Sequence, residues 1–137
     1  MYAITASQLY SIIKNKSKVI IYFWSPHCSG AACIPIYTFK NYCVQNGYKG
    51  IIVAQYYDFE QLAAQGIKPS EIYAINQKFY KSDYCNKYVK LFQNDFLKLY
   101  NNVPIKKYPY PYLYIENNQL LFAGFKNMPT PPWRAKG

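Results

Sequence analysis

Two cysteines and the only histidine of this chain lie close together in the segment FWSPHCSGAAC, residues 23–33. Cys28 follows a hydrophobic run, so we expect it just past the carboxyl end of a buried strand and at the start of a helix. Amides at a helix N-terminus stabilise a thiolate, and we expect the adjacent His27 to do the same. The alternative for His27 is a partly exposed loop histidine. A thiolate at Cys28 would be the attacking group in thiol–disulfide exchange.

Cys33 lies five residues after Cys28, across the small residues SGAA. Gly30 leaves room for a bend, so a disulfide between the two cysteines is sterically feasible. If the helix begins at Cys28, a step of five residues turns Cys33 away, and pairing requires the first turn to open. A metal site is disfavoured because the chain has no Cys-x₂-Cys or His-x₃-His spacing. We therefore expect neither a metal nor a cofactor.

The first half of the chain alternates between helical and strand patterns. Residues 5–16 predict an amphipathic helix capped by Thr5 or Ser7. Residues 18–24 and 50–57 are apolar runs typical of strands buried on both faces of a sheet. Between them, residues 33–44 have apolar positions at helical spacing, closed by Asn46-Gly47. A strand, a crossover helix and a second strand predict a parallel pair.

The second half is less regular. A short helical turn ends at Gly66, residues 67–83 are expected to be irregular, and a long helix follows with Ser82 or Asp83 as its cap. We place one apolar stripe on that helix: Tyr84, Tyr88, Leu91, Phe92, Phe96 and Leu99. Residues 111–116 and 119–125 predict a hairpin with its turn at Asn117-Asn118. The sequence thus predicts a single α/β domain over residues 1–137, with a central mixed sheet, helices on both faces, a C-terminal β-hairpin and a proline-rich tail, residues 126–137.

This order of elements resembles the thioredoxin superfamily. KVIIYFWSPHC is similar to the apolar strand and active-site cysteine of that family, and YPYPYLYI is similar to its cis-proline followed by a hairpin strand. The resemblance implies a thioredoxin-like fold in which Cys28 is the nucleophile and Pro111 the cis-proline. It implies a substrate groove at Trp24, Pro26, Tyr110 and Pro111. The extra helical segment, residues 67–102, resembles that of membrane-associated or periplasmic bacterial branches.

The resemblance implies a thiol–disulfide oxidoreductase that exchanges a Cys28–Cys33 disulfide with partner proteins. Two features depart from the family, because Ala31 occupies the usual position of the resolving cysteine and the proline-rich tail replaces the final helix. A redox-inactive interaction domain on the same fold is therefore the alternative. The Ser25, Cys28 and Cys33 spacing also resembles peroxiredoxins. A thiol peroxidase ranks third, because no arginine stands near the late hairpin strand to polarise a peroxide.

Charge and the remaining cysteines leave other questions open. The formal net charge is +10, with scattered lysines and a single arginine, Arg134. The first interpretation is a solvated basic surface, and the alternative is an anionic partner such as a membrane surface, an acidic protein or a nucleic acid. Specific nucleic-acid readout is disfavoured because it commonly uses arginine. We expect a monomer that is periplasmic or exported if a signal has been removed, and cytoplasmic otherwise. Cys43 is expected to be buried and inert, whereas a Cys43–Cys85 disulfide is conceivable in an oxidising compartment.

Overall fold

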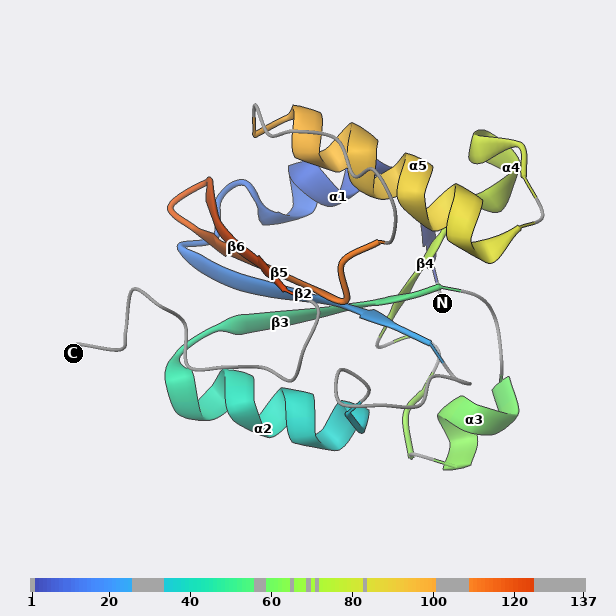
Figure 1. Ribbon diagram of the computed structural model, residues 1–137. Helices are drawn as coiled ribbons and strands as arrows, with labels where there is room; N and C mark the ends of the chain where they lie inside the picture. The colour runs from blue at the N-terminus through green and yellow to red at the C-terminus, as the bar shows by residue number, and fades with distance from the viewer. Residues whose placement is uncertain are drawn as a thin grey trace.

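A computed structural model gives the fold of the chain, and it describes residues 2–25, 34–55, 59–64, 66–68, 70, 72–82, 84–100 and 109–124. These residues form a mixed α/β structure around one six-stranded sheet with the strand order β1-β4-β3-β2-β5-β6 (Figure 1). The strands are β1 (Tyr2–Ile4), β2 (Lys18–Trp24), β3 (Lys49–Ala54), β4 (Tyr73–Ile75), β5 (Tyr112–Glu116) and β6 (Gln119–Gly124).

The middle of the sheet is the parallel pair predicted from the two apolar runs. β2 pairs with β3 in parallel, from Val19 opposite Lys49 to Trp24 opposite Ala54. On its other side β2 pairs antiparallel with β5, and β5 pairs antiparallel with β6. β2 therefore has a paired strand on each side, and helices cover both faces of the sheet (Figure 1). This explains why its sequence, KVIIYFW, is apolar without alternation.

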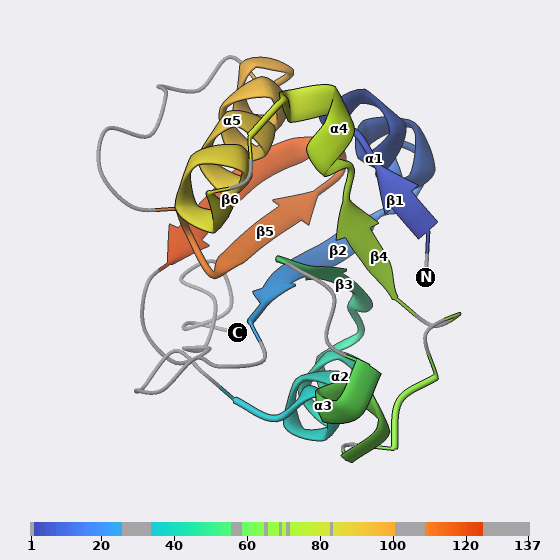
Figure 2. The ribbon, with the colours of Figure 1, turned by 90° about the vertical axis from the view of Figure 1, so that its right-hand side faces the viewer.

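The helices form two layers, one on each face of the sheet (Figures 1 and 2). One layer contains α1 (Ala6–Ile13), α4 (Gln77–Tyr80) and α5 (Cys85–Lys98), and the other contains α2 (Ile36–Asn46) and α3 (Phe59–Ala64). Side chains of β2 alternate between the layers: Val19, Ile21 and Phe23 pack with α1 and α5, whereas Ile20, Tyr22 and Trp24 pack with α2. The period of two along a strand thus divides the core into two halves.

The ends of the predicted helices are set by the expected residue types. Thr5 caps α1, because its side chain accepts a hydrogen bond from the Gln8 amide while the Gln8 side chain accepts one from the Thr5 amide. Gly47 ends α2 with a φ of 73°, a left-handed conformation that glycine adopts without a Cβ clash. Thr5, rather than Ser7, is therefore the cap.

The expectation that residues 67–83 are irregular is wrong. They include β4 and α4, and β4 pairs in parallel with β1 and with β3. The strand β1 was not predicted either. Each of these elements has three or four residues, which is too short for a hydrophobic period to become visible. β1 is a strand because it pairs with β4, and β4 also pairs with β3.

The predicted stripe on α5 is correct only in its centre. Tyr88, Phe92 and Phe96 are buried together with Val89 and Leu97, whereas Tyr84 is 78% exposed and Leu91 and Leu99 also face solvent. The start of α5 differs too: Tyr84 is the N-cap, and Ser82 only accepts a hydrogen bond from the Tyr84 amide at 3.2 Å. The buried face is thus narrower than a stripe drawn through every apolar residue.

The predicted C-terminal hairpin is confirmed. Asn117 and Asn118 connect β5 to β6, and their φ angles are 50° and 60°. Two successive positive φ angles give a turn whose twist matches that of the paired strands, and asparagine tolerates this conformation better than most residues. The Asn117 amide also donates to the Ser17 carbonyl at 2.7 Å, which holds the turn beside the start of β2.

Candidate functional site

Four of the predicted site residues, Pro26, His27, Cys28 and Cys33, lie outside the described residues, as does the proline-rich tail. The structure does describe the two residues that flank this segment, Ser25 after β2 and Ile34 before α2. It also describes the carboxyl ends of β2 and β3 and the start of β5. Together these residues form the frame from which the Cys28 segment departs and to which it returns.

The return of this segment is held by a tyrosine of β2. The Tyr22 hydroxyl donates a hydrogen bond to the Ile34 carbonyl at 2.8 Å. Burial is the largest cause that raises the pKa of Tyr22, so the hydroxyl stays protonated and remains a donor. Its ring stacks on Tyr112 of β5 with centroids 4.9 Å apart. This hydrogen bond therefore joins Ile34, the first described residue after the cysteine segment, to Tyr22 near the carboxyl end of β2.

A second contact joins the ends of β2 and β3 to helix α5 through Gln55. Its backbone amide donates to the Trp24 carbonyl at 2.9 Å, and its side-chain amide donates to the Phe23 carbonyl at 3.2 Å. Its backbone carbonyl accepts from the Tyr88 hydroxyl, and its side-chain oxygen lies 3.6 Å from the Cys85 thiol. All four polar groups of Gln55 thus fix the carboxyl end of β2 against α5.

A third contact fixes the residue before Pro111. The Gln93 side chain, which is fully buried, donates to the Tyr110 carbonyl at 2.7 Å and accepts from the Tyr110 amide at 2.8 Å. Pro111 then begins the pairing of β5, because its carbonyl accepts from the Phe23 amide at 2.9 Å. Pro111 therefore lies beside the carboxyl end of β2, on the edge of the strand opposite Gln55.

The expectation of a cis-proline at Pro111 is wrong. The peptide bonds between described residues are all trans, and these include the bond between Tyr110 and Pro111. An X–Pro bond favours trans by roughly 0.5–1 kcal/mol unless its surroundings select cis. Here Gln93 fixes the Tyr110 backbone and Phe23 fixes the Pro111 carbonyl, and both contacts are satisfied with the trans bond.

The side chains predicted to line a substrate groove differ in their exposure. Trp24 is only 3% exposed and packs with α2 in the core. Tyr110 and Pro111 are half-buried, and the Tyr110 ring packs against the core layer of α1 and α5. Of the described residues predicted to line the groove, Tyr110 and Pro111 are therefore partly exposed, whereas Trp24 lies in the core.

The two described cysteines lie on opposite faces of the sheet. Cys43 is buried beneath α2, and Cys85 is half-buried at the start of α5; both are free thiols. A Cys43–Cys85 disulfide is therefore excluded in this structure. Burial raises the pKa of Cys43 to about 12. Burial also raises the pKa of Cys85, although the nearby Tyr88 hydroxyl opposes this. Neither thiol is an activated nucleophile.

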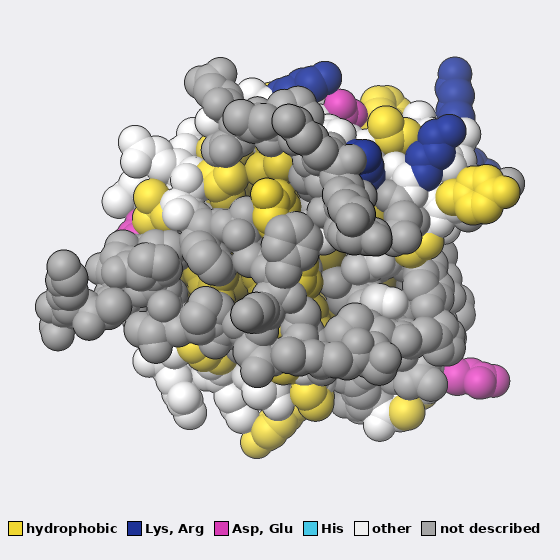
Figure 3. All heavy atoms as spheres, in the orientation of Figure 1, with side chains coloured by type: hydrophobic (Ala, Val, Ile, Leu, Met, Phe, Trp, Pro, Cys, Tyr) yellow, Lys and Arg dark blue, Asp and Glu magenta, His cyan; other side chains and the backbone are white. Residues whose placement is uncertain are grey.

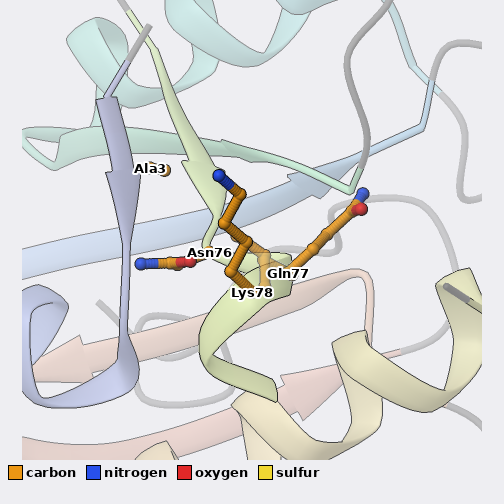
Figure 4. Close-up of a pocket in the computed structure, with 5 residues that line it drawn as sticks. Ala3, Asn76, Gln77 and Lys78 are labelled. Carbon is orange, nitrogen blue, oxygen red and sulfur yellow. The ribbon is translucent and has the colours of Figure 1, made fainter. Parts of the chain in front are cut away.

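A cavity also opens beside β1, away from this frame. It has a volume of about 420 Å³ and is lined by Ala3, Ile75, Asn76, Gln77 and Lys78. In Figure 4 the Asn76 side chain extends toward β1, whereas the Gln77 side chain points away from it. Within the described part of the chain, no three His, Cys, Asp or Glu side chains gather as metal ligands would. Among its described lining residues, Lys78 is the only titratable side chain.

Sequence reasoning missed Gln55 and Gln93, the two residues that build the frame. A usable signal existed for Gln93: it is a polar residue within the apolar face of α5, between Phe92 and Phe96. A polar residue in such a position is expected to have a buried partner. Gln55 carries no comparable signal. Two of its four partners are backbone carbonyls, those of Phe23 and Trp24, which the sequence does not reveal.

The chain matches no protein-family model, and no curated protein or solved structure is significantly similar to it.

Proposed function

We propose that this protein is a thioredoxin-like thiol–disulfide oxidoreductase in which Cys28 and Cys33 exchange a disulfide with partner proteins. The observation that carries the proposal is the hydrogen bond from the Phe23 amide to the Pro111 carbonyl, 2.9 Å long. It brings a proline that begins a hairpin strand next to the strand that leads into the Cys28 segment. In the thioredoxin superfamily, which this sequence resembles, a cis-proline in this position lies against the reactive cysteine; Pro111 has the same position with a trans bond.

The arrangement of the sheet supports the same proposal. The four strands β3-β2-β5-β6 run parallel, then antiparallel, then antiparallel, with helices on both faces. This is the core arrangement that the resemblance implies, and β1 and β4 extend it at one edge. The cysteine segment follows the carboxyl end of β2, where open α/β sheets commonly bind ligands.

The proposed reaction has two steps. The Cys28 thiolate attacks one sulfur of a partner protein's disulfide; a Cys28–partner S–S bond forms, and the second partner sulfur leaves as a thiolate. The Cys33 thiolate then attacks the Cys28 sulfur, forms the Cys28–Cys33 disulfide and releases the first partner sulfur as a thiolate. The partner disulfide gains two electrons and the cysteine pair loses two. The reverse sequence oxidises a partner dithiol, and neither direction needs a cofactor.

The frame has definite roles in this mechanism. Ser25 and Ile34 are joined through β2 and the Tyr22 hydroxyl, so both ends of the cysteine segment are fixed. Fixing the ends of a short loop reduces the entropy lost when its two thiols pair. His27 stabilises the Cys28 thiolate. Pro111 has no amide hydrogen, so it leaves the thiolate free of a competing backbone donor while Tyr110 and Pro111 contact the partner chain.

A redox titration of the purified protein tests this proposal. Free thiols are alkylated with a mass tag at each potential, and Cys28 and Cys33 are identified by peptide mass. We expect reversible loss of both tags at one potential between about −270 and −120 mV, the range of known oxidoreductases. Cys43→Ala is the matched control, because Cys43 lies against Gly50 near the opposite end of β3; it should leave the titration unchanged.

Other outcomes would overturn the proposal. If Cys28 and Cys33 never pair at any potential, Cys33 does not resolve Cys28. If the protein shows no exchange activity and Cys28→Ser still binds a protein partner, the domain is a redox-inactive interaction module. If micromolar hydrogen peroxide oxidises Cys28 faster than disulfides do, peroxidase chemistry replaces disulfide exchange.

A further inference from the structure

The two helical layers of this protein differ strongly in charge. Residues 5–16 and 76–100, which contain α1, α4 and α5, include seven lysines and two acidic residues. Residues 34–72, which contain α2 and α3, include three lysines and three acidic residues. The excess positive charge of this part of the chain therefore belongs to one face of the sheet. A charge of one sign on a single face attracts an anionic partner to that face.

Within the basic layer, one surface also carries exposed hydrophobic side chains. We call it the α4–α5 surface and define it by six exposed residues: Lys78, Phe79, Lys81, Tyr84, Lys87 and Leu91. Phe79 is 58% exposed and Leu91 is 38% exposed. Figure 3 shows lysine and hydrophobic side chains next to each other at the α4 end of this layer.

The fold makes these side chains point outward. Tyr84, Lys87 and Leu91 are three and four residues apart, so they lie along one side of α5. The adjacent side of α5 faces the core through Tyr88, Phe92 and Phe96, which are buried. In α4, Tyr80 points inward and accepts a hydrogen bond from the Ala6 amide at 3.0 Å, and this leaves the neighbouring Phe79 outside. The hydrophobic residues of the surface are therefore not needed for the core.

We propose that the α4–α5 surface docks on an anionic lipid bilayer. Lysines attract the headgroups, while Phe79, Tyr84 and Leu91 enter the boundary between headgroups and acyl chains. Among the described residues, no helix is long and apolar enough to cross a membrane, so the contact is a peripheral one. The inference does not depend on the thiol chemistry.

A nucleic acid fits this surface less well than a lipid headgroup layer does. The surface contains no arginine, the residue that binds bases and phosphates in a bidentate manner. Leu91 is aliphatic and offers no face on which a base can stack, whereas it gains from contact with acyl chains. The three hydrophobic side chains also extend from the outer sides of two helices, which present a protruding surface to a flat bilayer.

Co-sedimentation with vesicles tests the proposal. The full chain is mixed with vesicles of phosphatidylcholine containing phosphatidylglycerol, and separately with vesicles of phosphatidylcholine alone. We expect binding to the anionic vesicles only, and weaker binding as salt is added. One lysine near an anionic surface strengthens binding about fivefold, so Lys81→Glu/Lys87→Glu should weaken it about 25-fold or more.

The control variant Lys49→Glu/Lys68→Glu makes the same change in net charge on two exposed lysines within residues 34–72, outside the basic layer. It should weaken binding far less than the first variant does. Phe79→Ala should weaken binding severalfold at constant charge, because it removes apolar contact. Circular dichroism verifies that each variant is folded.

Three results would overturn the proposal. The first is no binding to the anionic vesicles. The second is an equal loss of binding in the two double variants, which would assign the interaction to net charge rather than to this surface. The third is tighter binding to a single-stranded or duplex oligonucleotide than to the vesicles at the same salt concentration, which would assign the surface to nucleic acid.

Discussion

The Gln93 side chain binds both the backbone amide and the backbone carbonyl of Tyr110. The two hydrogen bonds are 2.7 and 2.8 Å long and join the middle of α5 to the residue before Pro111. Because Gln93 is completely buried, water cannot replace either bond. A side chain seventeen residues earlier in the chain thus fixes where β5 begins and how Pro111 meets the end of β2.

Replacing Gln93 with leucine should destabilise the protein. The variant keeps an apolar side chain of similar length and leaves the Tyr110 amide and carbonyl without their partner. We expect the free energy of unfolding to fall by about 2–4 kcal/mol, since each unsatisfied group costs about 1–3 kcal/mol. Urea denaturation measures this change. Gln45→Leu, on an exposed side of α2, is the control and should change stability by less than about 0.5 kcal/mol.

Removing the Tyr22 hydroxyl should loosen the return of the cysteine segment. Tyr22→Phe keeps the ring stacked on Tyr112 and loses the hydrogen bond to the Ile34 carbonyl. We expect a loss of stability of about 1 kcal/mol and a Cys28–Cys33 disulfide that is easier to reduce in glutathione buffers. Tyr37→Phe removes an equivalent hydroxyl from an exposed position and should change neither quantity. Unchanged stability in Tyr22→Phe would contradict the role given to this contact.

The two described thiols should react at different rates with an alkylating reagent. In a Cys28→Ser/Cys33→Ser protein only Cys43 and Cys85 remain. The pKa of Cys43 is raised from 9.0 to about 12 by burial, so at pH 9 about one molecule in a thousand has this thiolate, rather than half. Cys85 should react slowly at neutral pH and faster as the pH rises. Modification of Cys43 before Cys85 in the folded protein would refute this order.

Alkaline pH should unfold the protein through its buried tyrosines. Burial raises the pKa of Tyr80 from 10.0 to about 12, and burial is the largest cause that raises those of Tyr100, Tyr112 and Tyr114. The unfolded chain loses these protons near pH 10 while the folded protein keeps them, so stability is full below pH 10 and falls above it. Urea denaturation at increasing pH measures the slope. Tyr80→Phe should make the slope shallower; an unchanged slope would show that Tyr80 does not contribute.

The sequence predicted the central strands well, because these strands are packed on both faces of the sheet. The runs at residues 18–24 and 50–57 predicted the parallel pair because strands covered on both faces need apolar residues at every position. A helix start, a helix end and a turn were predicted from Thr5, Gly47 and Asn117-Asn118. Each of these features depends on the conformation of a few neighbouring residues. Local chemistry of this kind can be read from one stretch of sequence.

The frame around the cysteine segment could not be predicted in the same way. Gln55 and Gln93 bind mainly backbone groups of distant residues, and a backbone group leaves no trace in the sequence. β1 is a strand because it pairs with β4, and β4 is a strand because it pairs with β1 and β3. The expected cis bond at Pro111 came from resemblance, whereas its actual geometry depends on contacts from α5 and β2. Cys28 and Cys33 lie outside the described residues, so their pairing stays a prediction.

The pairing of β1 with β4 has a consequence for folding during synthesis. Tyr2 pairs with Tyr73 and Ile4 with Ile75, so among the described strands β1 finds its hydrogen-bonded neighbour only after β2 and β3 have been made. β2 and β3 can pair earlier, since they are separated along the chain only by the segment that contains α2. Long-range closure of this kind is slow relative to local contacts. We therefore expect the amino-terminal strand to join the sheet late, as the step that closes one edge of a nascent chain already ordered around β2 and β3.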